Sequence, residues 1–97
     1  SSELTGSSKD ELNALIEFMN KKKAANVQID AYTDSVGDEE SNLDLSRERA
    51  FAVKTYLMDN GIEKDRLKSK GHGEDSTYDN ETKEGRAQNR RVEISIR

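Results

Sequence analysis

The sequence predicts a fold in which helices alternate with strands and pack on a small sheet. Two segments carry apolar residues at helical spacing, and three shorter segments have a strand-like character. In chain order they give helix, strand, helix, strand, a short helix and a last strand, which implies crossover connections and a sheet covered by helices. At 97 residues the chain has room for one domain, residues 1–97.

The composition describes a polar but folded chain. Hydrophobic residues make up 31% and charged residues 37%, and the mean hydropathy is −1.04. Because 16 basic residues nearly balance 20 acidic ones, the net charge is only −4, which favours a folded, soluble domain over a disordered one. The pI near 5.0 argues against nucleic-acid binding, which needs a basic surface. The absence of cysteine excludes disulfide frameworks, zinc ribbons and thiol chemistry.

The chain carries no obvious membrane or export segment. It has no run of 18 apolar residues, and its start, Ser1-Ser2-Glu3, has neither a basic nor an apolar signal region. Because it also lacks an initiator methionine, we expect a domain taken from a longer protein. Any membrane contact would then come from parts of that parent protein outside this fragment.

The first helix is expected at about residues 9–23. Ser8 and Glu11 have the spacing of a capping box, with Ser8 as the N-cap. Apolar residues at helical spacing follow on one face: Leu12, Leu15, Ile16 and Met19. The first strand is expected at residues 27–32. Its apolar alternation is carried by Val27, Ile29 and Ala31.

The second helix is expected at about residues 42–60, after turn-forming residues at 33–40. Its apolar side is supplied by Leu43, Leu45, Ala50, Val53 and Leu57. Asn60-Gly61 ends this helix, with Gly61 as the left-handed residue that follows it.

The last third of the chain is less regular. Residues 67–70 predict a short strand that ends in Gly71-His72-Gly73, and the acidic residues 74–82 predict a loop. Residues 83–89 are expected to form one or two helical turns. Residues 92–96 alternate apolar and polar side chains and predict the last strand.

A candidate binding site lies where the first strand ends. Asp34 follows that strand, and Arg49 lies in the arginine-rich first half of the second helix. Ligands bind at the carboxyl ends of strands in sheets with helical crossovers. An aspartate could hold an ammonium there, and an arginine could grip a carboxylate with two donors. The alternative is structural: Asp34 caps a turn, and Arg49 forms a salt bridge on the helix surface.

Several short motifs occur in a fixed order along the chain. They are Tyr32-Thr33-Asp34-Ser35-Val36-Gly37, Asn42, Leu45-Ser46-Arg47-Glu48-Arg49-Ala50, Gly61-Ile62, Gly71-His72-Gly73-Glu74 and Asn89-Arg90-Arg91-Val92-Glu93-Ile94. Together they resemble the OmpA-like C-terminal domain, the peptidoglycan-binding module of OmpA-, Pal- and MotB-type proteins. The resemblance runs from about Leu4 to Arg97. It implies an α+β, β-α-β-α-β-β layered fold, with two main helices packed on a small mixed sheet and a first strand missing from this fragment.

The resemblance also implies a ligand and a location. The ligand is the meso-diaminopimelate of the peptidoglycan stem peptide, a zwitterion that fits the chemistry above. The family's site residues correspond to Asp34, Arg49, Asn42 and Arg90, with Thr33 beside Asp34. The resemblance therefore implies noncovalent anchoring of a larger envelope protein to the cell wall, without a metal or cofactor. It also implies a periplasmic location in a Gram-negative bacterium, in association with the cell wall and outer membrane.

The chain departs from the family pattern in two places. Ala31-Tyr32 stands where many members have glycine and histidine, and Thr77-Tyr78 stands where a loop proline is common. These departures leave room for an alternative, a protein-interaction module of an envelope or flagellar-motor complex that keeps the fold without binding the wall. A cell-wall hydrolase is a third hypothesis, but no carboxylate is placed in an apolar pocket that would raise its pKa, so we expect a binder without catalytic residues.

For the remaining charged residues and the single histidine, structural roles are weighed against metal or ligand binding. His72 is the only histidine and is expected in a surface turn, since one histidine is too few for a zinc site. The acidic residues at 34 and 38–40 lack EF-hand spacing, so they predict a solvated loop rather than a calcium site. Arg86, Arg90 and Arg91 form a basic cluster that either binds a ligand or pairs with nearby acids. A sheet edge left open by a missing strand could pair with a second copy, so a homodimer is a further expectation.

Overall fold

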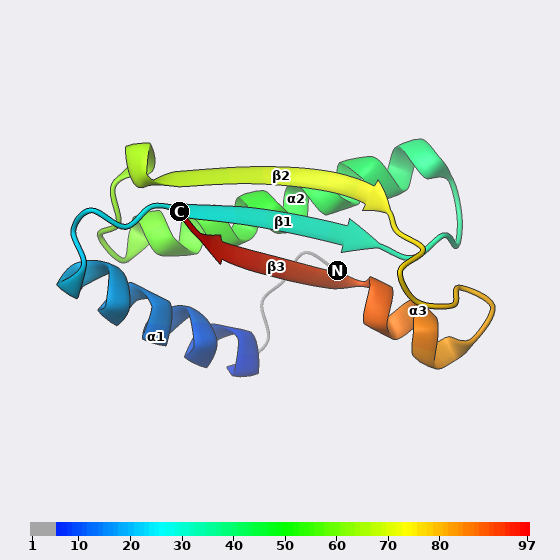
Figure 1. The fold of residues 1–97 in the computed structure, drawn as a ribbon. Coiled ribbons are helices and arrows are strands. Elements are labelled where there is room, and N and C mark those ends of the chain that lie inside the picture. The colour runs from blue at the N-terminus through cyan, green and yellow to red at the C-terminus, as the bar shows by residue number, and fades with distance from the viewer. Residues whose placement is uncertain (1–5) are drawn as a thin grey trace.

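The computed structural model describes residues 6–97, whose fold is shown in Figure 1. In chain order the elements are α1 (Gly6–Lys21), β1 (Val27–Thr33), α2 (Glu39–Asp59), the 3-10 turn η1 (Lys64–Arg66), β2 (Leu67–Glu74), α3 (Lys83–Asn89) and β3 (Arg91–Ile96). The predicted alternation of helices and strands is confirmed. No helix in this part of the chain is long and apolar enough to cross a membrane. The further strand expected before Ser1 lies outside the described residues.

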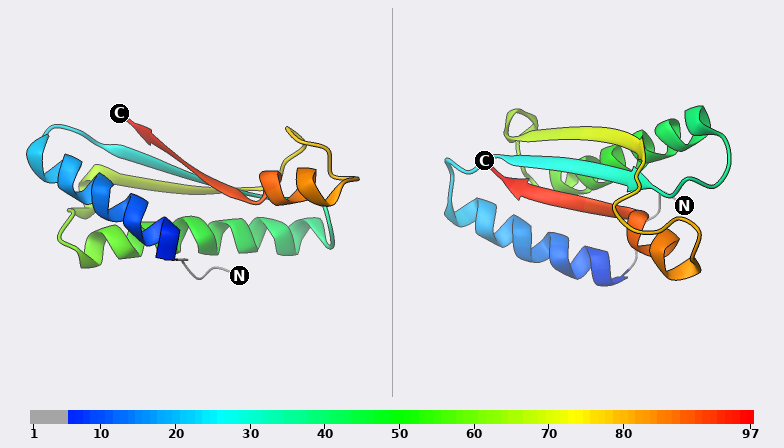
Figure 2. Two further views of the ribbon diagram at one scale, coloured as in Figure 1. Left: turned by 90° about the horizontal axis from the view of Figure 1, so that it is seen from below. Right: turned by 45° about the vertical axis from the view of Figure 1, so that its right-hand side comes forward.

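The three strands form one mixed sheet in the order β2-β1-β3. The central strand β1 pairs parallel with β2 and antiparallel with β3. Both long helices, α1 and α2, lie on the same face of this sheet, while α3 sits at one end (Figure 2). The α+β class with two main helices on a small mixed sheet is therefore confirmed, and no helix within residues 6–97 covers the opposite, open face of the sheet.

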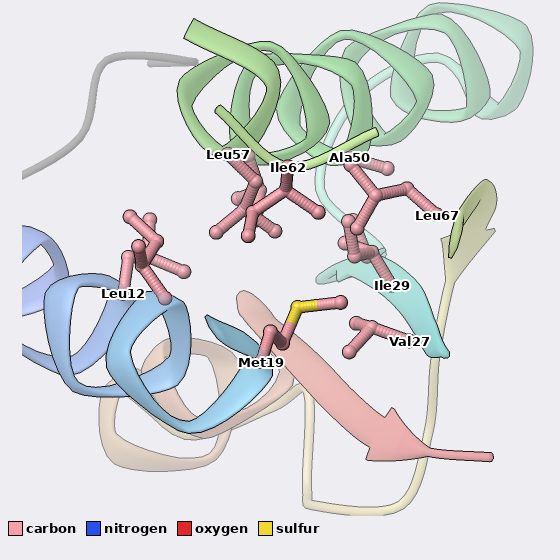
Figure 3. Packing of buried hydrophobic residues seen from close by; sticks show 11 residues of the cluster. Leu12, Met19, Val27, Ile29, Ala50, Leu57, Ile62 and Leu67 are labelled. Atoms are coloured by element: carbon pink, nitrogen blue, oxygen red, sulfur yellow. The ribbon is translucent and has the colours of Figure 1, made fainter. Parts of the chain in front are cut away.

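The core lies between the sheet and the two long helices. Along β1 every second residue is buried, as the predicted alternation requires. The apolar faces of α1 and α2 meet these residues, and Figure 3 shows Leu12 and Met19 facing Leu57 across the interior. The buried cluster comprises Leu12, Ile16, Met19, Val27, Ile29, Ala31, Ala50, Val53, Leu57, Ile62 and Leu67.

The predicted bounds of α1 were wrong at both ends. Ser8 lies inside the helix rather than capping it, because α1 spans Gly6–Lys21. At the other end, the guanidinium of Arg66 donates hydrogen bonds to the carbonyls of Met19, Lys22 and Ala25, at 3.1, 2.9 and 2.8 Å. A side chain from a distant turn thus satisfies the carbonyl groups where the helix ends, which local spacing does not reveal.

The second helix also begins earlier than expected. Its N-cap is Asp38, whose Oδ2 accepts a hydrogen bond from the backbone N–H of Ser41 at 2.9 Å. The negative charges of Glu39 and Glu40 in the first turn suit the positive end of the helix dipole. The predicted C-terminal stop is confirmed, since Gly61 has φ +94° and the chain reverses through the bond from the Ile62 N–H to the Leu57 carbonyl, 3.1 Å.

Strand β2 continues through the segment that was expected to be a turn. Ala31 of β1 pairs with Gly71, but Tyr32 pairs with Gly73, so His72 is an extra residue in a β-bulge. The prediction of a surface turn around His72 was therefore wrong. Gly73 has φ +75°, a conformation that glycine adopts without a Cβ penalty, and this allows the bulge.

Candidate functional site

The candidate site lies at the carboxyl end of β1, where the amino-terminal half of α2 and the junction of α3 with β3 also meet (Figure 1). Asp34 directly follows β1, Arg49 belongs to α2, and Arg90 lies between α3 and β3. The fold thus gathers at one end of the sheet residues as far apart in the sequence as Asp34 and Arg90.

Asp34 is a nearly buried carboxylate with fixed partners. It is 8% exposed; its Oδ2 accepts a hydrogen bond from Nη1 of Arg90 at 2.6 Å, and its Oδ1 accepts one from the Val36 N–H at 3.0 Å. Burial alone would raise the pKa of Asp34. The hydrogen bonds from Arg90 and Val36, together with the charges of Arg90 and Arg86, outweigh burial and hold that pKa below its usual value. Asp34 is therefore a permanent anion at neutral pH.

Arg49 belongs to the same group of charges. Burial and, after it, the positive charge of Arg90 lower the pKa of Arg49, whereas the carboxylate of Asp34 raises it. Arg49, Arg90 and Asp34 are thus close enough to act on one another. Arg90 pairs with Asp34, and a guanidinium group such as those of Arg49 and Arg90 is suited to an anionic ligand group.

Asn42 and Thr33 hold the loop that carries Asp34. The side-chain amide of Asn42 donates to the Val36 carbonyl at 2.9 Å, to the Asp34 carbonyl at 3.4 Å and to Oε2 of Glu74 at 3.1 Å. Thr33 is 2% exposed, and its hydroxyl donates to the Asp34 carbonyl at 2.9 Å. In this structure both residues brace the loop, and Glu74 at the end of β2 is part of that support.

Asn89 organises the loop on the other side of the site. Its side chain is fully buried, accepts from the Tyr78 N–H at 3.0 Å, and donates to the Tyr78 carbonyl at 2.9 Å and to Oδ1 of Asn80 at 2.7 Å. Thr82 caps α3 by accepting from the Gly85 N–H at 2.9 Å. No role for Asn89 was predicted from the sequence. The signal that could have indicated one is its position directly before Arg90 in the Asn-Arg-Arg motif.

Tyr32, His72 and Arg91 form a layered group on the open face of the sheet. The rings of Tyr32 and His72 stack with centroids 4.7 Å apart and planes 10° apart, and the guanidinium carbon of Arg91 lies 4.3 Å from the Tyr32 ring centroid. Nε2 of His72 lies 2.7 Å from Oδ1 of Asp30, and Arg91 pairs with Asp75 at 2.8 Å. Tyr32 is thus held by its neighbours on the open face of the sheet.

Several members of the acidic and basic clusters have partners inside the protein. Asp38 caps α2, Asp34 pairs with Arg90, and Nη1 of Arg86 donates to the Asn80 carbonyl at 2.9 Å. Within residues 6–97, no group of three or more metal-ligating side chains that could hold an ion is present.

Comparison with known proteins identifies relatives over nearly the whole chain. A family model described as the OmpA family matches residues 1–91. Outer membrane porin F of Pseudomonas fluorescens is 42% identical over 83 residues, covering 84% of this chain and 26% of that protein. Peptidoglycan-binding protein ArfA of Mycobacterium tuberculosis is 40% identical over 86 residues, covering 88% of this chain and 26% of the relative.

A solved structure shows the same fold. The peptidoglycan-associated lipoprotein of Burkholderia pseudomallei superimposes with a TM-score of 0.94 at 22% identity, covering the whole of this chain and 83% of that one. The chain spans only about a quarter of the length of each of the two sequence relatives.

Proposed function

This chain belongs to the OmpA family, and we propose that it binds peptidoglycan noncovalently through the meso-diaminopimelate of the stem peptide. The observation that carries the proposal is the group formed by Asp34, Arg49 and Arg90, an almost buried carboxylate beside two guanidinium groups. The 40% identity to a protein named for peptidoglycan binding supports the choice of polymer.

The charges of the site match those of the ligand. A free diaminopimelate end carries an ammonium and a carboxylate. A carboxylate has about four acceptor positions, and Val36 and Arg90 occupy two on Asp34, so an ammonium can still bind it. The ligand carboxylate would lie against Arg49 and Arg90, since a guanidinium group can hold a carboxylate with two parallel hydrogen bonds. Thr33 and Asn42 would act mainly by holding the Asp34 loop in place.

Binding of this kind would anchor a longer protein to the wall. We place residues 1–97, as one module, in the periplasm of a Gram-negative bacterium, attached to an outer-membrane protein. The similarity to outer membrane porin F, of which this chain matches about a quarter, supports this arrangement. The module would act as a binder, not as an enzyme, because the site offers charges for recognition and no paired acid and base for hydrolysis.

The test compares binding of purified sacculi by three variants. Asp34→Ala and Arg49→Ala each remove one charged partner, so we expect binding about 10- to 150-fold weaker, or loss of detectable binding. Arg97→Ala is the matched control, because it removes a guanidinium from the exposed last residue and should bind like the unchanged chain. Circular dichroism spectra would verify folding.

Normal sacculus binding by Asp34→Ala or Arg49→Ala would refute the site. Failure of the unchanged, folded chain to bind sacculi would favour the interaction-module alternative. Release of soluble fragments from the sacculi would indicate a hydrolase instead.

A further inference from the structure

We propose that the outer edge of β2 and the adjoining surface of α2 bind an extended, acidic segment of another protein as an added strand. This interaction goes beyond wall binding and uses a different part of the molecule. Strand addition supplies main-chain hydrogen bonds for affinity, while pockets for alternate side chains supply specificity.

The outer edge of β2 is open over its first half. β2 is an outer strand of the sheet, and no strand within residues 6–97 pairs with its far side. Toward its end the edge is occupied, since the Gly73 N–H donates to the hydroxyl of Ser46 on α2 at 2.8 Å. The stretch available for an added strand is therefore Leu67–Lys70.

A groove runs beside this open stretch. It has a volume of about 400 Å³. Its walls come from α2 and β2 and comprise Arg47, Glu48, Ala50, Phe51, Ser69, Lys70 and Gly71. Phe51 is 62% exposed, and it lies one helical turn from Arg47, so both side chains face the same side of α2. The groove thus combines an unpaired strand edge with an exposed aromatic ring on the helix beside it.

The register of the sheet determines what an added strand would meet. Ser69 pairs with buried Ile29, so it points to the helix side, whereas Lys70 pairs with Asp30 on the open face. Lys68, two residues before Lys70, shares that open face. Alternate side chains of an added strand would therefore lie toward Phe51 and toward the two lysines.

The charged residues beside the groove and along β2 indicate the chemistry of the partner. The chain as a whole carries a net charge of −4, but two lysines, Lys68 and Lys70, lie along the open stretch of β2. The groove itself is lined by Lys70, by Arg47, which pairs with Asp44 at 3.4 Å, and by Glu48 as its one acidic residue. A segment that alternates apolar with acidic side chains would place the apolar set on Phe51 and the acidic set beside the lysines. Lysines on a strand edge also disfavour pairing of two copies of β2, because their charges would repel.

Wall binding and strand addition would be independent. Arg49 follows Arg47 by two residues, which turns it about 200° around α2, away from the groove. A domain bound to the wall through Arg49 would therefore still present the β2 edge. It would hold another envelope protein while anchored.

The test is an NMR titration of the isotope-labelled chain with a blocked octapeptide that alternates valine with glutamate. We expect shifts at Leu67–Lys70 and at Phe51, with slower exchange of the outward amide protons of β2. A peptide with lysine in place of glutamate should bind more weakly, and one with central prolines should not bind, because proline removes backbone donors. Phe51→Ser should weaken binding, and Lys70→Glu should weaken it about tenfold and favour the lysine peptide.

Four results would overturn the proposal. The first is the absence of shifts at millimolar peptide, and the second is equal binding of the acidic and basic peptides. The third is a set of shifts confined to β3. The fourth is a concentration-dependent shift of the β2 edge without peptide, which would identify a second copy of the chain as the occupant. Sacculus binding by Phe51→Ser, measured in parallel, should equal that of the unchanged chain. That comparison separates failure of this proposal from failure of wall binding.

Discussion

Replacing Gly71 with alanine tests how closely α2 packs on the sheet. A Cβ at this position would lie 2.6 Å from the Cα of Arg47 and from the carbonyl carbon of Ser46, and it would also contact the Arg47 backbone nitrogen. Ordinary contacts begin near 3.4 Å, so the two backbones would have to separate by about 0.8 Å. These atoms belong to the backbone of a long helix, so no side chain can rotate to relieve the overlap.

The loss of stability in Gly71→Ala should lie at the upper end of the range for overpacked core sites. Gly71 is not among the residues with positive φ, so alanine meets no backbone strain and the overlap decides the outcome. We expect the free energy of unfolding to fall by about 3 kcal/mol, which for a chain of this size lowers Tm by roughly 12–24 °C. The displaced α2 would also move Arg49 relative to Asp34, so binding of sacculi should weaken.

Urea unfolding followed by circular dichroism measures this loss. Ser69→Ala is the matched control, because it changes the neighbouring helix-facing position of β2 without adding an atom, and it should change stability by less than about 0.5 kcal/mol. A similarly small loss of stability for Gly71→Ala, with the amide shifts of α2 unaltered, would show that α2 does not pack against β2 as closely as these distances require.

Three further predictions concern the supports of the site and its charge. Asn89→Ala should cost about 2–3 kcal/mol in urea unfolding, because it leaves the backbone groups of Tyr78 without partners; a loss below 0.5 kcal/mol would contradict that role. Asp38→Ala should cost about 1 kcal/mol through loss of the α2 cap, and an unchanged midpoint would argue against it. Asp34 has a lowered pKa in the folded state, so its stabilisation by Arg90 is full above the ordinary value of 3.8 and is lost as the pH falls through the folded-state pKa. The stability gap between the unchanged chain and Asp34→Asn should therefore shrink in acid, and a gap independent of pH would contradict the ion pair.

The sequence predicted best those elements whose pattern is local. The alternation in β1, the helical spacing in α1 and the Asn60-Gly61 stop of α2 each depend on neighbours in the chain, and all three are confirmed. The short helix α3 has the predicted bounds of 83–89 for the same reason.

Features that depend on distant residues were missed. Gly71 and Gly73 suggested a turn, but pairing with β1 and the hydroxyl of Ser46 keep that segment in β2. Arg66 ends α1 from a turn more than forty residues away. Tertiary contacts override local preference in both cases.

The candidate site likewise combines residues that the sequence pattern points to and contacts that only the fold creates. Asp34 and Arg49 could be selected from residue type and position alone, but only as one of two interpretations. The bond between Asp34 and Arg90 spans 56 residues, and the bracing of the Asp34 loop by Asn42 and Glu74 spans strand and helix ends that only the fold brings together. The ligand roles of these residues remain predictions that binding experiments decide.

Titration of the folded chain with a stem peptide that contains meso-diaminopimelate, followed by NMR, tests the central claim most directly. We expect shifts centred on Asp34, Asn42, Arg49 and Arg90. A peptide that carries lysine in place of diaminopimelate should give no such shifts, because lysine there lacks the second carboxylate that Arg49 would bind. Absence of shifts at millimolar stem peptide, or equal shifts with both peptides, would contradict that claim.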